Sequence, residues 1–440
     1  METIIRIAQL LLSLSILVIL HEGGHFFFAK LFKTRVEKFY MFFDPWFSLF
    51  KFKKGDTEYG IGWIPLGGYV KISGMIDESM DTEQLKQAPQ PWEFRSKPAW
   101  QRLLIMLGGV LVNVLLAFVI YIFILWGWGE RYLPNSALTN GIMVDSIGQE
   151  LGLQNGDKIL SIDGKTIEQF KKIPAKILLG NPKTIEIERN GQQKTIPINT
   201  KLIPQLLKDP TFIFPRIPFV VSNLVDNMPA QKAGLQPKDK IVAINNTPIR
   251  FFDEAKALFN SYKGQTVSIT IERKHETITK EISISSDGKI GIYHSNDIAS
   301  TYHFKTKEYS FFQAIPAGIV KTIQVIDSYI KQLKLIFTPS TGAYKSVGGF
   351  IAIGKIFPGT WDWLSFWSLT AFLSIMLAVL NLLPIPGLDG GHVLFTLWEM
   401  VSGKKPSDKF LEYAQMVGLG ILLLLVLYAN GNDIVKLFMK

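Results

Sequence analysis

The segment His21-Glu22-Gly23-Gly24-His25 combines residue types whose spacing has a definite chemical meaning. On a helix, residues four positions apart share a face, so both imidazoles can bind one metal ion. The carboxylate of Glu22 then stands beside the metal, where it can act as a general base. We therefore predict a zinc site with His21 and His25 as ligands. The alternative is a pair of structural histidines, which must explain three ionisable groups inside an apolar span, where such groups are rare.

A catalytic zinc site needs a third protein ligand and one open coordination position. Asp389 is the best candidate for that ligand. The preceding Pro384, Pro386 and Gly387 are expected to break an apolar helix near its cytoplasmic end, and unwound backbone at membrane depth is tolerated only where it lines a cavity. Two alternatives stay open. His392 is a second candidate ligand, and Asp389 is otherwise a simple helix cap that faces water.

The composition of the 440-residue chain excludes several other chemistries. It contains no cysteine, which excludes a disulfide framework, a thiolate zinc site and a cysteine nucleophile. Lys and Arg number 47 against 37 Asp and Glu, so the formal charge is +10. The basic excess lies beside apolar runs and forms no aromatic-laced patch, so we expect no nucleic-acid partner.

Four apolar runs are long enough to cross a bilayer core, which takes about 20 residues. Uncharged runs cover residues 103–129 and 363–388, a third covers 413–432, and a fourth begins at residue 7 and continues as a helix to about residue 29. The run that begins at residue 7 looks at first like a signal peptide, but no small-residue cleavage site follows it. We therefore predict four transmembrane helices in contact with the lipid bilayer.

Basic residues beside these runs predict the orientation, because positive side chains are retained on the cytoplasmic side. They follow the run that begins at residue 7, precede the run 103–129, and fill the loop between the runs 363–388 and 413–432. Both termini and the stretch from about 130 to 362 then face outward, which means the periplasm if the cell is a Gram-negative bacterium. In such a cell this pattern predicts a multi-pass protein of the inner membrane. The residues concerned are Lys30, Lys33, Arg35, Lys38, Lys97, Arg102, Lys404, Lys405 and Lys409.

The outward stretch contains an internal repeat, in which residues 153–164 align with residues 235–246. Each copy reads as a turn, a strand, a hairpin turn, a helix and two further strands. This order resembles a PDZ domain, and residues 229–235 look like the PDZ segment of bacterial envelope proteases. PDZ domains bind extended peptide ends by adding a strand to a sheet edge. A generic module that only spaces the membrane helices is the alternative.

Taken together, these motifs resemble the site-2 protease family of intramembrane zinc metalloproteases. The resemblance rests on the His-Glu-x-x-His motif of the first span, on Asn381-x-x-Pro384-x-x-x-Leu388-Asp389-Gly390 in the third span, and on the tandem PDZ-like copies between them. Residues 67–71 and 109–113 also fit the family pattern, so the resemblance covers essentially the whole chain.

The resemblance implies roles for individual residues. His21, His25 and Asp389 would hold Zn²⁺, and Glu22 would be the general base. Asn381 would hydrogen-bond the substrate backbone near the scissile bond. The resemblance also implies substrates: anti-sigma factors cleaved in envelope stress signalling, and leftover signal peptides.

Two further segments have expected roles near the membrane. Residues 35–73 are rich in aromatic residues, and the resemblance implies a β-structure that dips into the cytoplasmic leaflet, with an edge strand able to pair with substrate. An interfacial aromatic belt without substrate contact is the alternative. Residues 309–337 carry apolar residues at helical spacing, which is typical of a helix lying along the outer membrane face.

The expected fold is a polytopic α-helical membrane protein with four transmembrane helices, a membrane-associated β-hairpin region and two extracytoplasmic α+β PDZ domains. The expected segments are transmembrane helix 1 (1–32), the cytoplasmic-side re-entrant β region and loop (33–100), transmembrane helix 2 (101–129), PDZ domain 1 (130–208), PDZ domain 2 (209–290), an amphipathic region (291–361), transmembrane helix 3 (362–402) and transmembrane helix 4 (403–440).

The expected function is regulated intramembrane proteolysis of single-span membrane proteins already shortened on their outer side. The PDZ pair would act as a size filter that admits trimmed substrates. The alternative function is a catalytically inactive, membrane-anchored PDZ adaptor. The intact Glu22 argues against that alternative, because a purely structural zinc site needs ligands but no base.

Overall fold

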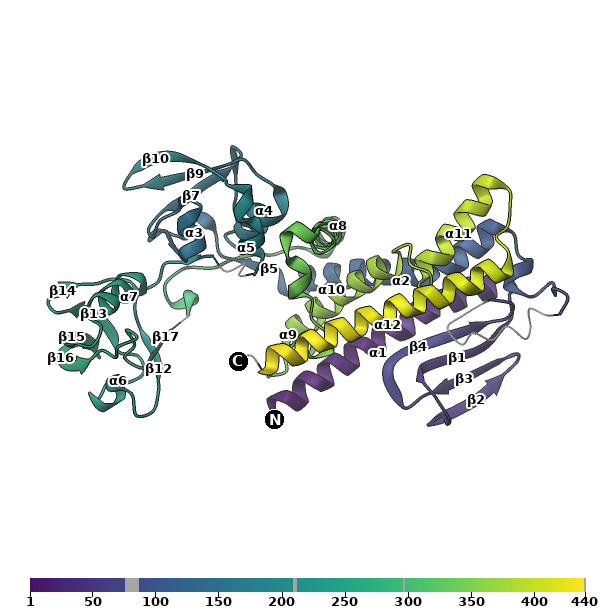
Figure 1. The fold of residues 1–440 in the computed structure, drawn as a ribbon, viewed down its shortest axis with the longest axis horizontal. Coiled ribbons are helices and arrows are strands. Elements are labelled where there is room, and N and C mark those ends of the chain that lie inside the picture. The colour runs from purple at the N-terminus through teal and green to yellow at the C-terminus, as the bar shows by residue number, and fades with distance from the viewer. Residues whose placement is uncertain (76–86, 209–211, 296, 439–440) are drawn as a thin grey trace. The chain divides into compact units, whose positions relative to one another are not determined.

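The computed structural model describes residues 1–75, 87–208, 212–295 and 297–438 (Figure 1). The predicted 33–100 region therefore includes residues 76–86, which lie outside the described residues. The chain divides into two compact units. The first unit combines Met1–Gly129 with Glu308–Lys440, and the second is Glu130–Lys307.

The first unit contains four helices that are long and apolar enough to cross a membrane, counting only the described residues. The middle of each helix is rich in Leu, Ile, Val and Phe, as expected of a helix that is apolar on all sides. The second of them, α2, ends where Gly129 takes a φ of 67°, a conformation that favours glycine. The four helices are α1 (Glu2–Leu31), α2 (Ala99–Trp128), α10 (Trp363–Asn381) and α12 (Asp408–Phe438).

Helix α2 is the centre of this unit, because α1, α10, α8 (Phe311–Ile336) and α11 (Asp389–Ser402) all pack against it. Helices α1 and α2 approach each other closely where Gly24 faces Gly108. A Cβ on Gly108 would lie 2.6 Å from the Gly24 carbonyl oxygen, so only glycine fits there. Gly24 therefore brings the His-Glu-x-x-His turn of α1 directly against α2.

The third apolar run is interrupted, as its Pro and Gly residues predict. Helix α10 ends at Asn381, and α11 begins at Asp389. Gly387 in the interruption has a φ of 97°, which a residue with a side chain rarely adopts. Gly418 of α12 packs against the backbone of Pro386, so the unwound segment is covered by the last helix.

A four-stranded sheet lies beside α1, in the order β2-β3-β1-β4 (Figure 1). Strand β1 pairs with β4 in antiparallel fashion and with β3 in parallel fashion, while β2 and β3 form a hairpin. Strand β4 is therefore an edge strand, and it packs against α1. The strands are β1 (Val36–Phe43), β2 (Phe50–Lys54), β3 (Thr57–Ile61) and β4 (Ile64–Ile72).

The segment that follows the second unit begins with α8 and continues through α9 (Phe350–Ile356). Ala314, Gly318 and Thr322 of α8 are buried, while Phe312 and Ile323 are exposed. The buried face packs on α2 and α10. The exposed apolar face is the one expected to meet the membrane surface, which stays a prediction.

The second unit contains two modules with the same order of elements, as the repeat predicts. Each has a four-stranded antiparallel sheet and one main helix. The first module contains β7 (Lys158–Ile162), β8 (Lys165–Thr166), α4 (Lys172–Gly180), β9 (Thr184–Arg189) and β10 (Gln192–Pro197). The second contains β13 (Lys240–Ile244), β14 (Thr247–Pro248), α7 (Phe252–Ser261), β15 (Thr266–Arg273) and β16 (Glu276–Ser283).

The modules extend beyond the segment limits predicted at residues 208 and 290. Strand β11 (Ile213–Pro215) pairs with β6 (Ile142–Val144) in the first module, and β17 (Ile292–His294) pairs with β12 (Val221–Leu224) in the second. These strands have three or four residues each, too few for the alternating pattern that reveals a strand in sequence. Other short elements are β5 (Glu130–Tyr132), β18 (Lys305–Lys307), α3 (Ser146–Glu150), α5 (Ile203–Lys208) and α6 (Pro229–Lys232).

Both modules contain the same buried ion pair, which supports their origin by duplication. Asp157 pairs with Arg189 at 2.7 Å in the first module, and Asp239 pairs with Arg273 at 2.6 Å in the second. Each aspartate also accepts a hydrogen bond from a backbone N–H three residues earlier. The pair fixes the turn before the first strand to the end of the third, and so closes each core.

Candidate metal centre

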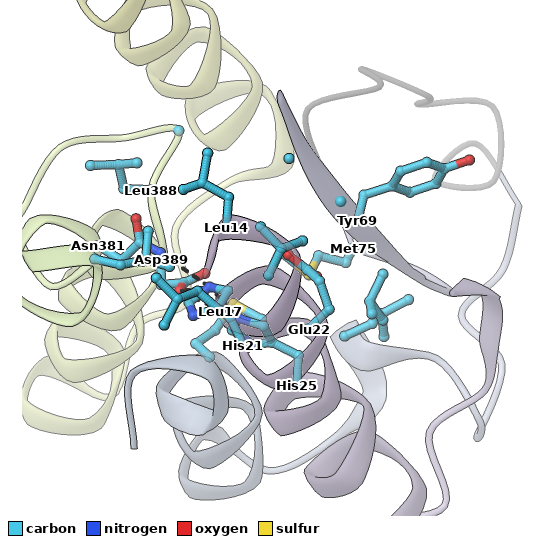
Figure 2. Close-up of a pocket in the computed structure, with 18 residues that line it drawn as sticks. Leu14, Leu17, His21, Glu22, His25, Tyr69, Met75, Asn381, Leu388 and Asp389 are labelled. Atoms are coloured by element: carbon cyan, nitrogen blue, oxygen red, sulfur yellow. Dashed lines mark hydrogen bonds and ion pairs between the residues drawn. The ribbon is translucent and has the colours of Figure 1, made fainter. Parts of the chain in front are cut away.

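Two histidines of α1 and the first residue of α11 converge on one point (Figure 2). The Nε2 atoms of His21 and His25 lie 3.3 Å apart. Oδ2 of Asp389 lies 3.3 Å from the first of these nitrogens and 3.4 Å from the second. Both histidines are 6% exposed. The structure thus brings together three residues that the sequence predicts as ligands, from two ends of the chain.

This donor set fits zinc. Two imidazole nitrogens and one carboxylate oxygen are a ligand set typical of catalytic zinc, at about 2.0–2.1 Å from the metal. Ligands at that distance in a tetrahedron lie about 3.3–3.4 Å from one another. The three separations match that spacing. In the part of the chain that the structure describes, Oδ2 of Asp389 is also buried without a hydrogen-bond partner, as expected of an atom that faces a metal.

The local fold explains why these side chains meet. His21 and His25 are one helical turn apart on α1, so they share a face. Asp389 opens α11 directly after the interruption, which turns the chain back toward α1. Gly109 of α2 faces both imidazoles, and a Cβ there would lie 2.5 Å from Nε2 of His25. The absence of a side chain at Gly109 leaves the space that the two rings occupy.

The imidazole rings are held from their other side. Nδ1 of His25 lies 2.8 Å from the carbonyl oxygen of Ile105. Nδ1 of His21 lies 3.0 Å from the side-chain amide of Asn113. A metal-binding histidine commonly has such a partner on its second nitrogen, because the partner fixes the ring's tautomer and direction.

The three candidate ligands line a cavity of about 280 Å³. Glu22 and Asn381 line the same cavity, so all five residues that the sequence predicts for the site lie around it (Figure 2). The amide of Asn381 lies 3.1 Å from Nε2 of His21. Apolar side chains and residues 67–70 of β4 complete the wall. The apolar residues include Leu14, Leu17, Val18, Ile72, Met75, Met106, Leu377 and Leu388.

His392, the alternative third ligand, lies elsewhere. It follows Asp389 by three residues on α11 and lines a separate small cavity with Arg95 and Arg102. Among the described residues, the cluster that could hold a metal contains Asp389 and not His392. The geometry therefore favours Asp389.

The sequence alone predicts no individual role for Gly109 or Asn113, although residues 109–113 fit a family pattern. The available signal was a glycine and an amide four positions apart inside an apolar helix, which places both on one face. What that face meets is visible only in the structure.

A buried zinc-type donor set in a unit that contains four long apolar helices fits a membrane-embedded metalloprotease. The family model described as Peptidase family M50 matches residues 9–425, and the chain belongs to this family, whose members are site-2-type proteases that depend on zinc. The chain is accordingly a membrane zinc protease, and Zn²⁺ is its cofactor.

Individual relatives agree with this assignment over nearly the full chain. The regulator of sigma E protease of Haemophilus influenzae is 30% identical, with 98% of this chain and 99% of the relative covered. The regulator of sigma-E protease RseP of Salmonella typhimurium is 27% identical, with the same coverage. A protein of Borreliella burgdorferi named as a zinc metalloprotease is 28% identical, with 96% of each chain covered.

Proposed function

We propose that this protein cleaves single-span membrane proteins within or beside their transmembrane helix, after an earlier cut has shortened them on the outer side. The observation that carries the proposal is the convergence of His21, His25 and Asp389 at a cavity between apolar helices, with Glu22 on the same cavity. A hydrolytic site at this place meets substrates that lie in the membrane.

The residues around the cavity would have separate roles in peptide hydrolysis. His21, His25 and Asp389 would hold zinc, which when bound polarises the scissile carbonyl and acidifies water. Glu22 takes the proton from the attacking water and later gives it to the leaving amine, which is the double duty of a general acid and base. The apolar side chains in the cavity wall limit the access of bulk water. Electrostatic interactions inside the cavity are stronger because less water screens them.

Asn381 would hold the substrate backbone near the scissile bond. Its amide lies 3.1 Å from Nε2 of His21, so it stands at the edge of the metal centre. An amide there can donate to a peptide carbonyl and accept from a peptide N–H. This role positions the substrate and leaves the proton transfers to Glu22.

The edge strand β4 would receive the unwound substrate. A helical substrate hides its peptide bonds in its own hydrogen bonds, so it must be extended before cleavage. Strand β4 pairs with β1 on one side only, and its residues Gly67, Gly68 and Val70 line the cavity. A peptide that pairs with this edge would pass the candidate ligands, and the two glycines present no side chain to obstruct it.

The two modules of the second unit would be PDZ domains facing the periplasm, where they exclude substrates with large outer domains. Support comes from the shared order of elements and from a cavity of about 480 Å³ in the second module. That cavity lies between α7 and residues 287–293, with Phe219, Phe252 and Phe259 in its wall. An apolar groove beside a helix suits an extended peptide end.

The basic flanks of the apolar helices support an inner-membrane location with both termini and the PDZ modules in the periplasm. Relatives from Haemophilus influenzae and Salmonella typhimurium carry the name regulator of sigma E protease. By this similarity the substrates would be anti-sigma factors in envelope stress signalling, together with leftover signal peptides.

The test is to co-express the protein, as wild type or as Glu22→Gln, with a tagged single-span substrate. The substrate is made both full-length and without its outer domain, and its membrane fragment is followed by blotting. Cleavage of only the shortened form by only the wild type supports the protease and the filter. Equal cleavage of both forms discards the filter, and equal cleavage by Glu22→Gln discards the role of Glu22. Absence of any cleavage favours the inactive adaptor.

A further inference from the structure

Asn113 is a polar side chain at the centre of the apolar helix α2, and it is fully buried. Its side-chain nitrogen is placed 3.0 Å from Nδ1 of His21, the ring nitrogen that points away from the candidate metal position. Its side-chain oxygen is buried and, among the described residues, has no hydrogen-bond partner. A buried amide in an apolar helix is costly unless it is bonded, so its contact with His21 needs an explanation.

The hydrogen bonding of a metal-bound histidine explains the contact between Asn113 and His21. A neutral imidazole that gives Nε2 to a metal carries its proton on Nδ1, and that N–H needs an acceptor. For His25 the acceptor is the carbonyl oxygen of Ile105, at 2.8 Å. For His21 the amide of Asn113 occupies the corresponding place.

The amide can present either of its ends to the ring. A half-turn of the amide exchanges oxygen and nitrogen with little change in shape, and the two atoms are assigned only from their partners. With nitrogen on Nδ1, the ring proton sits on Nε2 and blocks metal binding. With oxygen on Nδ1, Nε2 is free for the metal. Only the second orientation is compatible with His21 as a ligand.

We propose that Asn113 is a positioning residue for the metal centre, whose amide oxygen accepts the Nδ1–H of His21 and so presents Nε2 to zinc. The proposal rests on the ligand role of His21 in the proposed function. It identifies a contribution of α2 to zinc affinity, made without contact to the metal or the substrate.

The surroundings of Asn113 are suited to this role. Its backbone carbonyl accepts a hydrogen bond from the Ser374 hydroxyl of α10, at 2.8 Å. Gly109, one helical turn earlier, leaves space for both imidazoles. The same face of α2 therefore makes room for the rings and holds one of them in direction.

The test measures zinc affinity of the purified, detergent-solubilised full chain by competition with a chromophoric chelator. Asn113→Leu keeps the approximate size but removes the acceptor, and we expect zinc affinity to fall about 10–100-fold. Asn113→Asp keeps an acceptor oxygen, and we expect affinity within a few-fold of wild type. Ser374→Ala is the matched control, because it removes a bond to the Asn113 backbone and leaves the side-chain contact; we expect unchanged affinity.

The outcomes distinguish the positioning role of Asn113 from the ligand role of His21. Wild-type zinc affinity in a folded Asn113→Leu protein would overturn the positioning role. So would an Asn113→Asp protein that binds zinc as weakly as Asn113→Leu, because the required end of the amide would then be its nitrogen. Should Asn113→Leu fail to fold by circular dichroism, Asn113→Ala takes its place in the comparison. A wild-type protein that binds no zinc would refute the ligand assignment itself.

Discussion

Replacing Gly109 with alanine is expected to disable the metal centre while leaving the helix intact. A Cβ at this position would lie 2.5 Å from Nε2 of His25 and 2.5 Å from Cε1 of His21. Ordinary contacts begin at about 3.4 Å, so the rings or α1 must retreat by about 0.9 Å. Alanine is also a better helix former than glycine by about 1 kcal/mol, so a loss of function would not come from a weakened α2.

The expected effect follows from that displacement. A shift of about 1 Å in a catalytic group can cost on the order of 100-fold in rate, even when the protein stays folded. We therefore expect Gly109→Ala to cleave a shortened single-span substrate about 100-fold more slowly than wild type. Bound zinc should fall in parallel, because both displaced rings are candidate ligands.

The assay compares cleavage rate, zinc content and helical circular dichroism for wild type, Gly109→Ala and Gly127→Ala. Gly127 lies on the same helix, but its Cβ position meets no atom within 4 Å among the residues described. Gly127→Ala should therefore behave as wild type. Wild-type cleavage and zinc content in Gly109→Ala would refute the reasoning, since the rings would then not need this space.

Three further predictions concern other parts of the structure. Gly24→Ala should destabilise the α1–α2 contact by about 1–3 kcal/mol, because its Cβ would meet the backbone of Gly108. Thermal unfolding checks this against Gly23→Ala, whose Cβ position is open in the described structure. Asp389→Ala should lose zinc by metal analysis, while His392→Ala should retain it; the reverse result would exchange the two assignments. Burial lowers the pKa of His294 from its ordinary value of 6.5, so the unfolded chain binds more protons just below that pH. The second module should therefore lose stability as pH falls from 7 to 5, and His294→Gln should flatten that dependence in thermal unfolding.

Much of this protein could be predicted from short stretches of its sequence, because the physics involved is local. The spacing of His21 and His25 places both on one helical face, whatever surrounds the helix. The lengths of the apolar runs predict the four long helices, and Pro384 with Gly387 predicts the interruption before α11. The repeated strand and helix pattern predicts two similar modules.

The closing strands of those modules could not be predicted in the same way. Strands β11 and β17 have three residues each, and their partners lie about 70 residues earlier in the chain. Pairing at such a separation depends on the packed module and not on local propensity. The repeat alone therefore does not locate these closing strands.

The metal centre also combines features that the local sequence predicts with features that only the tertiary structure shows. Sequence by itself determined that α1 carries a pair of histidines and a carboxylate, because helix geometry needs only neighbouring residues. It left Asp389 and His392 as rival third ligands and gave no reason for Gly24, Gly109 or Asn113. The tertiary structure places Asp389 beside the two histidines, which favours it over His392, and it shows what the glycines and the amide face. The physical reason is that those contacts join α1, α2 and α11, and the close packing of helices far apart in the chain sets which side chains meet.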